Sequence, residues 1–160
     1  VDRAGDPALR EFRSALEDMT RELAFMIAHD GAKSDRLLTC DVVGAESARS
    51  ARNIGRSIVD SILVRVGIAG AEPRAGRIVM AVGKSHFGID QRMIGITIGG
   101  FPVAANGMRV AEYDEIPIAA HMQTASIDIA VSVGAGAGMA TVYSCDLTHG
   151  YISINADYRS

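Results

Sequence analysis

The sequence predicts a single domain of the α/β class, in which long helices lie on a mostly β body. Two helical patterns separated by a strand-like run occupy the first third of the chain. From Met93 onward, short apolar runs alternate with glycine-rich turn signals, as is typical of strands. A length of 160 residues fits one domain, and the composition of 48% hydrophobic and 22% charged residues argues against disorder.

The first helix is the clearest element. Asp6 and Pro7 form an N-cap followed by proline at the first helical position. The helix is predicted to end at His29-Asp30-Gly31, with Gly31 as the residue after the C-cap. Apolar residues recur at steps of three and four, so we expect one face to pack in the core. This stripe comprises Leu9, Phe12, Leu16, Met19, Leu23 and Met26.

A strand over Arg36–Val43 and a second helix over Ala45–Leu63 come next. The buried face of this helix is expected to carry Ala48, Ala51, Ile54, Ile58 and Ile62. Its polar face carries Arg49, Arg52 and Arg56, which we interpret as a solvated surface. A loop is predicted over Gly67–Gly76 and a short strand over Arg77–Val82.

The second half reads as strands joined by turns, with one further helix. Gly99-Gly100 and Asn106-Gly107 are dipeptides that favour tight hairpin turns. In chain order we predict a turn at Gly88–Arg92, strands at Met93–Ile98, Phe101–Ala104 and Met108–Val110, a helix within Ile116–Ala125, a strand at Ser126–Val133, a turn at Gly134–Gly138, and strands at Ala140–Ser144 and Tyr151–Ile154.

Composition excludes several classes of protein. With 16 basic and 19 acidic residues the net charge is −3, which argues against a nucleic-acid partner. The longest uncharged runs, Met93–Met108 and Ile129–Cys145, contain several glycines and are too short to span a membrane. The chain begins at Val1 without the features of a signal peptide, and we expect it to be a fragment of a longer polypeptide. Cys40 and Cys145 form neither a disulfide framework nor a zinc knuckle.

Local motifs for catalysis or cofactor binding are weak. The Gly134–Gly138 stretch has Met139 where a dinucleotide loop needs its last glycine, so we interpret it as a turn. Cys145 and His149 supply a thiol and a base, but their spacing defines no geometry. The four histidines show no metal-ligand spacing. We therefore expect no cofactor and no metal.

The C-terminal segment, by contrast, is dense in hydrogen-bonding side chains up to its last residue. It reads CDLTHGYISINADYRS and resembles CDLT-x-x-Y-[VI]-x-INADYR-[TS], the signature of the ornithine acetyltransferase (glutamate N-acetyltransferase) family. Further segments are similar to the family in order along the chain. They are Asp30-Gly31 (family DGEGATK), Val43-Gly44-Ala45, Glu72–Arg77 (family DPNWGR), Ala81-Val82-Gly83 and the glycine-rich turn Gly134–Gly138.

The resemblance implies the fold and the reaction. The fold would be a layered α/β sandwich of the ornithine acetyltransferase type, a mixed sheet with long helices packed on it, completed by a partner chain. Residues 1–160 would be one domain, the C-terminal part of the family's β chain. In the family a precursor cuts itself before a Thr, and that Thr takes acetyl from N-acetylornithine and passes it to glutamate. The amine of an N-terminal Thr can act as its own base.

The resemblance also implies partners and setting. The partners would be a companion α chain, a Thr-headed β segment from the same precursor and small amino-acid substrates, in a higher oligomer of αβ units. The setting would be arginine biosynthesis in the cytoplasm, with neither nucleic acid nor membrane involved.

Matched positions place part of the substrate site in this chain and the nucleophile outside it. Asn155 and Ser160 would bind substrate, and Ala32 and Lys33 lie in the matching loop. The family's acidic residue in that loop falls on Ala32, and Lys33 would disfavour a cationic amino acid, so we expect an altered substrate. The chain starts at Val1 instead of Thr, which leaves no catalytic residue here.

Two alternatives stay open. Water could resolve the acyl-enzyme in place of glutamate, which would make the protein an amide hydrolase of the same fold. The missing Thr also permits a non-catalytic structural subunit of a degenerate family member.

Overall fold

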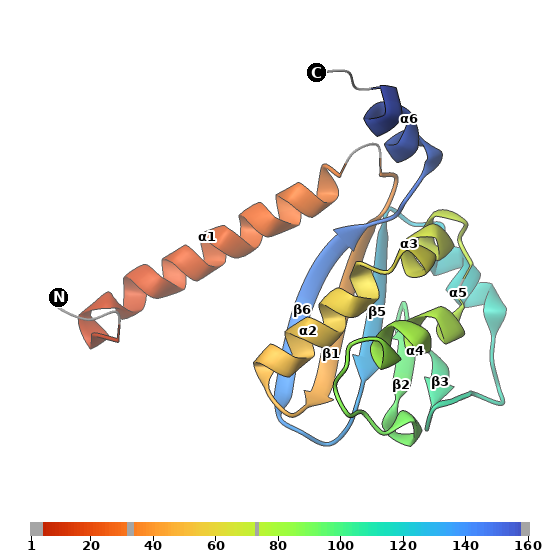
Figure 1. Ribbon diagram of the computed structural model, residues 1–160, viewed down its shortest axis with the longest axis horizontal. Helices are drawn as coiled ribbons and strands as arrows, with labels where there is room; N and C mark the ends of the chain where they lie inside the picture. Colours follow the sequence, from red (N-terminus) through yellow and green to blue (C-terminus); the bar gives the residue numbers. More distant parts are fainter. Residues whose placement is uncertain (1–4, 32–33, 73, 158–160) are drawn as a thin grey trace.

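A six-stranded mixed sheet forms the body of the protein in the computed structural model, which describes residues 5–31, 34–72 and 74–157 (Figure 1). The strand order is β4-β3-β2-β5-β1-β6. Only β1 and β5 run parallel, and the other neighbours are antiparallel. The strands are β1 (Leu37–Ala45), β2 (Gly95–Ile98), β3 (Phe101–Ala105), β4 (Met108–Arg109), β5 (Ser126–Ser132) and β6 (Gly138–Cys145).

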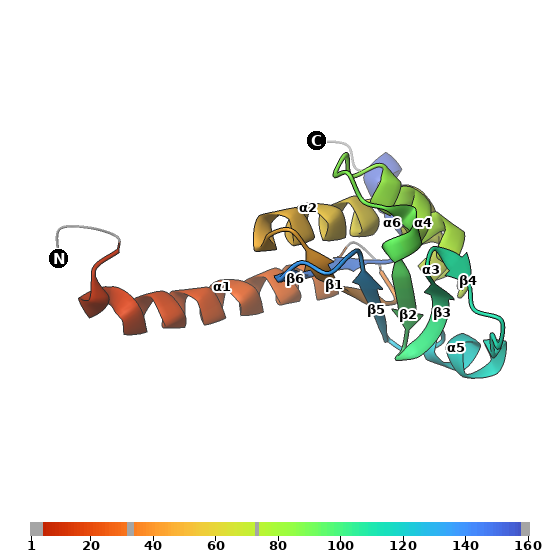
Figure 2. The same ribbon diagram turned by 90° about the horizontal axis from the view of Figure 1, so that it is seen from below.

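Helices α2 and α4 cover one side of the sheet and α1 lies on the other side (Figure 2). Helix α5 lies at the end of the strands and contributes Ile118 and Met122 to the same core as α2 and α4. The expected layered α/β architecture is therefore confirmed. The helices are α1 (Arg10–His29), α2 (Ala48–Val59), α3 (Ile62–Ala69), α4 (Ala75–Gly83), α5 (Glu115–His121) and α6 (His149–Asp157), with 3-10 turns at Pro7–Leu9 and Gln91–Met93.

The core lies between the sheet and the helices α2 to α4. Ile54 and Ile58 of α2 are fully buried, and they pack with alternate residues of the central strands such as Ile129. Ser47 caps α2 by accepting a hydrogen bond from the backbone N–H of Ser50. As predicted, Arg49, Arg52 and Arg56 are exposed. Ala48 and Ile62, expected on the buried face, are exposed as well: Ala48 is the first residue of α2, and Ile62 begins the separate helix α3.

Both predicted glycine turns are confirmed. Gly99 and Gly100 join β2 to β3 with φ values of +59° and +82°, the pair of positive angles that a type I′ hairpin turn requires. Asn106 and Gly107 have φ values of +52° and +72° at the turn into β4. The helix expected within Ile116–Ala125 is present as α5, with Pro117 in its first turn, and the predicted turn at Gly134–Gly138 lies where the chain passes from β5 into β6.

Two predicted strands are wrong. Arg77–Val82 lies in the helix α4, where the buried residues Ile78, Ala81 and Val82 recur at helical steps of three and four. The predicted loop Gly67–Gly76 is likewise shortened by α3 and α4. Tyr151–Ile154 lies in α6, because the chain leaves the sheet at Cys145 and no strand is there for it to pair with.

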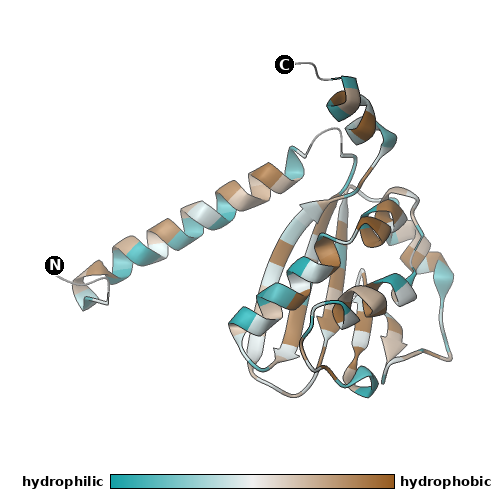
Figure 3. Cartoon of the chain, viewed as in Figure 1, coloured by the Kyte–Doolittle hydropathy of each residue, from teal (hydrophilic) through white to brown (hydrophobic). Residues whose placement is uncertain are grey.

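The apolar stripe of α1 is not part of the core of this chain. Phe12, Met19 and Met26 are 63%, 53% and 56% exposed, and no residue of α1 is buried. The helix projects beyond the sheet, with apolar and polar residues alternating along its length (Figure 3). Its C-terminal half lies against the strand β6, where the ring of Phe25 packs edge-on against Tyr143 at 5.7 Å.

Candidate functional site

The segment linking α1 to β1 meets the segment linking β6 to α6 at one edge of the sheet. Leu37 at the start of β1 pairs with Cys145 at the end of β6. Gly31, after α1, lies so close to Cys145 that a Cβ atom at Gly31 would fall 2.5 Å from its Sγ. We call Gly31, Asp35, Arg36, Cys145 and Asp146 the corner. Two segments more than 100 residues apart in sequence are thus held together.

Asp146 forms the centre of the corner and is only 2% exposed. Its Oδ1 accepts a hydrogen bond from the backbone N–H of Asp35 at 3.0 Å. Its own backbone N–H donates to the carbonyl of Arg36 at 3.1 Å. Its Oδ2 is buried and has no hydrogen-bond partner among the described residues. Burial raises the pKa of Asp146, and hydrogen bonding of its carboxylate to the backbone at Asp35 and Arg36 offsets part of that effect.

Arg65 of α3 holds the corner from the other side. Its Nε donates to the carbonyl of Cys145 at 2.8 Å, and its Nη2 lies 3.2 Å from Cys145 Sγ and 3.4 Å from the carbonyl of Asp146. The backbone N–H of Leu147 donates to the carbonyl of Arg65. A planar guanidinium suits this role because its donors are fixed in a fork.

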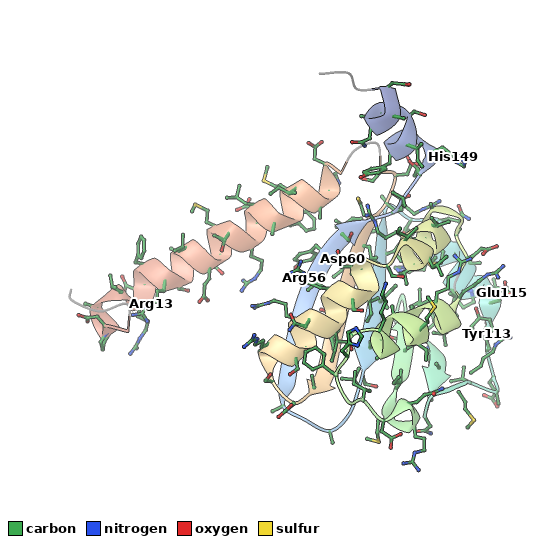
Figure 4. All side chains as sticks on the ribbon, viewed as in Figure 1. Arg13, Arg56, Asp60, Tyr113, Glu115 and His149 are labelled. Carbon is green, nitrogen blue, oxygen red and sulfur yellow. The ribbon has the colours of Figure 1, made fainter. Side chains whose placement is uncertain are left out.

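Of the predicted substrate residues, only Asn155 is in the described part of the chain. Asn155 is on α6, exposed, and its Nδ2 donates to the carbonyl of Tyr151 at 2.8 Å. Ala32, Lys33 and Ser160 lie outside the described residues. Figure 4 shows His149 at the start of α6. Roles for these residues in binding stay predictions.

The weaker motifs have structural explanations. The Sγ of Cys145 contacts Arg65, and Cys145 is half-buried in the corner. The glycine-rich turn packs backbone to backbone, since a Cβ at Gly136 would lie 2.1 Å from the carbonyl oxygen of Ala45. Among the described residues, no three side chains of the metal-ligating types gather in one place. In the same part of the chain, no helix is long and apolar enough to cross a membrane.

A model of the ArgJ family matches residues 2–160. The chain belongs to the ArgJ family. It is 48% identical to the arginine biosynthesis bifunctional protein ArgJ of Gluconobacter oxydans over 160 residues, which is the whole of this chain and 38% of that protein. It is 44% identical to the ArgJ protein of Zymomonas mobilis, covering 98% of this chain and 40% of that one.

The fold agrees with a solved ArgJ structure. The crystal structure of the arginine biosynthesis bifunctional protein ArgJ from Bacillus halodurans superposes with a TM-score of 0.90 at 31% identity. The superposition covers 98% of this chain and 73% of that chain. This chain spans about two fifths of the length of the curated ArgJ proteins that it matches.

Sequence reasoning did not single out Asp146 or Arg65 as members of the site. Asp146 stands within the CDLT part of the C-terminal signature, so the motif itself carried a usable signal. Arg65 shows no such signal. Its partners are backbone carbonyls 80 residues away in sequence, and a contact of that kind leaves no local sequence pattern.

Proposed function

We propose that this chain is the C-terminal part of an acyltransferase that moves an acetyl group between amino acids in arginine biosynthesis. N-acetylornithine is the proposed donor and glutamate the proposed acceptor. The observation that carries the proposal is the match to the ArgJ family along residues 2–160, which includes the CDLTHGYISINADYRS signature. Because the family's acidic residue falls on Ala32, we propose that ornithine-type substrates bind more weakly here than in the family but are still turned over.

The reaction would use a Thr that lies outside this chain. The Thr hydroxyl attacks the acetyl carbonyl of the donor, the amide C–N bond breaks, and the free amine leaves with the hydroxyl proton. The amine of glutamate then attacks the acetyl ester and restores the hydroxyl. The part of this chain would be to bind and orient the amino acids, through Asn155 and Ser160 and through the loop that holds Ala32 and Lys33.

The exposed face of α1 supports a companion segment. Leu16, Met19, Leu23 and Met26 are between 41% and 56% exposed along one side of a 20-residue helix. A contiguous apolar face of this kind marks an interaction surface. About three fifths of the length of the curated relatives lies outside this chain. We propose that the companion α chain and the Thr-headed segment cover this face, in a cytoplasmic assembly of αβ units.

Mass spectrometry of the complete assembly tests the proposal. The full-length precursor would be expressed, and every resulting chain would be sequenced from its N-terminus. We expect a chain headed by Thr, which gains an acetyl adduct when N-acetylornithine is added without glutamate. An adduct that decays to acetate with glutamate present would support the amide hydrolase instead. The absence of any Thr-headed chain and of any adduct would favour the non-catalytic subunit.

A further inference from the structure

We infer that Asp146 is a positioning residue that fixes the spacing between the two segments proposed to bind substrate, the loop after α1 and the segment that begins with α6. The inference rests on the proposed function. Asp146 would not touch the substrate. It would act through the backbone of residues 35 and 36 on one side and through the start of α6 on the other.

Asp146 contacts the loop through both its side chain and its backbone. Oδ1 accepts from the N–H of Asp35, and the N–H of Asp146 donates to the carbonyl of the next residue, Arg36. Two bonds to consecutive residues fix both the position and the direction of the loop as it enters β1. Because Asp146 is 98% buried, these bonds do not compete with water.

The helix α6 takes its placement from the short link in which Asp146 is the middle residue. No residue of α6 is buried, so packing does not hold it against the sheet. The link from Cys145 to Leu147 connects it to the body, and Arg65 fixes this link through the carbonyls of Cys145 and Asp146. Asn155 therefore takes its position relative to the loop from the corner.

The second carboxylate oxygen shows that this contact is not optimised for stability. Oδ2 is buried without a partner among the described residues, which is unfavourable for a charged group. The charges of Asp35 and Arg36 face this carboxylate, whereas the guanidinium of Arg65 on α3 lies against the backbone carbonyl of Asp146. The side-chain contact to the loop needs only one acceptor, Oδ1. The amide oxygen of an asparagine at position 146 would serve equally well.

Steady-state kinetics of the complete assembly tests this inference. Asp146→Ala is expected to raise KM for donor and acceptor about tenfold, the effect of one lost hydrogen bond, with a smaller change in kcat. Asp146→Asn keeps the acceptor and is expected to stay within about threefold of the wild type. Asp114→Ala is the matched control. The Oδ1 of Asp114 also accepts from a backbone N–H, that of Ile116 at 3.0 Å, but at the start of α5.

The inference is overturned if Asp146→Ala leaves KM unchanged, or if Asp114→Ala raises KM equally. Should Asp146→Ala fail to fold, Arg65→Lys is the second variant, because it removes the guanidinium that holds the carbonyls of Cys145 and Asp146. The same rise in KM is expected, and an unchanged KM overturns the inference. If the wild type transfers no acetyl group, the proposed function fails separately. Amide hydrogen exchange then tests the inference. Exchange in Asp146→Ala is expected to be faster at Asp35 and across α6, and unchanged exchange would overturn the inference.

Discussion

Gly55 of α2 lies directly against Val142 of β6, and a Cβ atom at Gly55 would fall 2.7 Å from Val142 Cγ2. This close approach seats α2 on the strand that leads into the corner. Glycine in the middle of a helix normally costs up to about 1 kcal/mol relative to alanine. Its presence at position 55 is explained by this contact.

Gly55→Ala is therefore expected to destabilise the protein by about 1–3 kcal/mol through overpacking, despite the better helix propensity of alanine. Thermal unfolding measures the change. Gly83→Ala is the control, since nothing lies within 4 Å of a Cβ at Gly83 near the end of α4. It is expected to be neutral or stabilising by up to about 1 kcal/mol. In a Val142→Ala background, Gly55→Ala should cost less stability than it does in the wild type. An equal cost in both backgrounds would contradict this explanation.

Burial raises the pKa of Cys40 from its ordinary value of 9.0 to about 12, and the neighbouring charge of Asp41 adds to the effect. The folded state keeps the thiol protonated while the unfolded state ionises above pH 9. The stability that the neutral thiol contributes is thus complete below pH 9 and is lost as the pH rises toward 12. Between pH 9 and pH 10, the free energy of unfolding is expected to fall by about 1 kcal/mol less in Cys40→Ala than in the wild type. Parallel stability curves for the two proteins over that interval would argue against a neutral buried thiol.

The exposed face of α1 gives a prediction about assembly. Leu23→Asp is expected to weaken association with the rest of the polypeptide at least tenfold, because burying a leucine contributes about 1.5–3 kcal/mol and a buried carboxylate costs more. Co-purification of the processed chains measures the effect. Ser14→Asp adds the same charge to an exposed position of α1 outside the apolar stripe and should leave assembly intact. Equal behaviour of the two variants would show that this face is not the interface.

Arg36 anchors the end of α3 by donating from Nη1 to the carbonyls of Ile68 at 2.9 Å and Ala69 at 2.8 Å. The last carbonyls of a helix need such partners. Arg36→Met is expected to lower the free energy of unfolding by about 1–3 kcal/mol. Arg49→Met, at an exposed position of α2, should change it by less than about 0.5 kcal/mol. Chemical denaturation of the two variants checks this difference.

Local patterns predicted the elements whose signals lie within a few residues. The hairpin at Gly99-Gly100 is an example, since its turn chemistry is contained in two glycines. Arg77–Val82 was mispredicted because its β-branched residues outweighed a short helical period. Tyr151–Ile154 was mispredicted because strand formation depends on a neighbour that the sheet does not provide.

The candidate site could be predicted only as far as the C-terminal signature reached. The motif indicated Asn155 and Ser160, whose roles stay predictions. The corner could not be foreseen, because it depends on contacts between Asp35 and Asp146, 111 residues apart. The expectation that the α1 stripe packs in the core was wrong for this chain, because no residue of α1 is buried.

The measurement that tests the central claim most directly is a product analysis of the complete assembly supplied with N-acetylornithine and glutamate. We predict that ornithine and N-acetylglutamate appear in equal amounts, with little free acetate. Ornithine accompanied by acetate alone, or no ornithine at all, would contradict acetyl transfer between amino acids as the function of this protein.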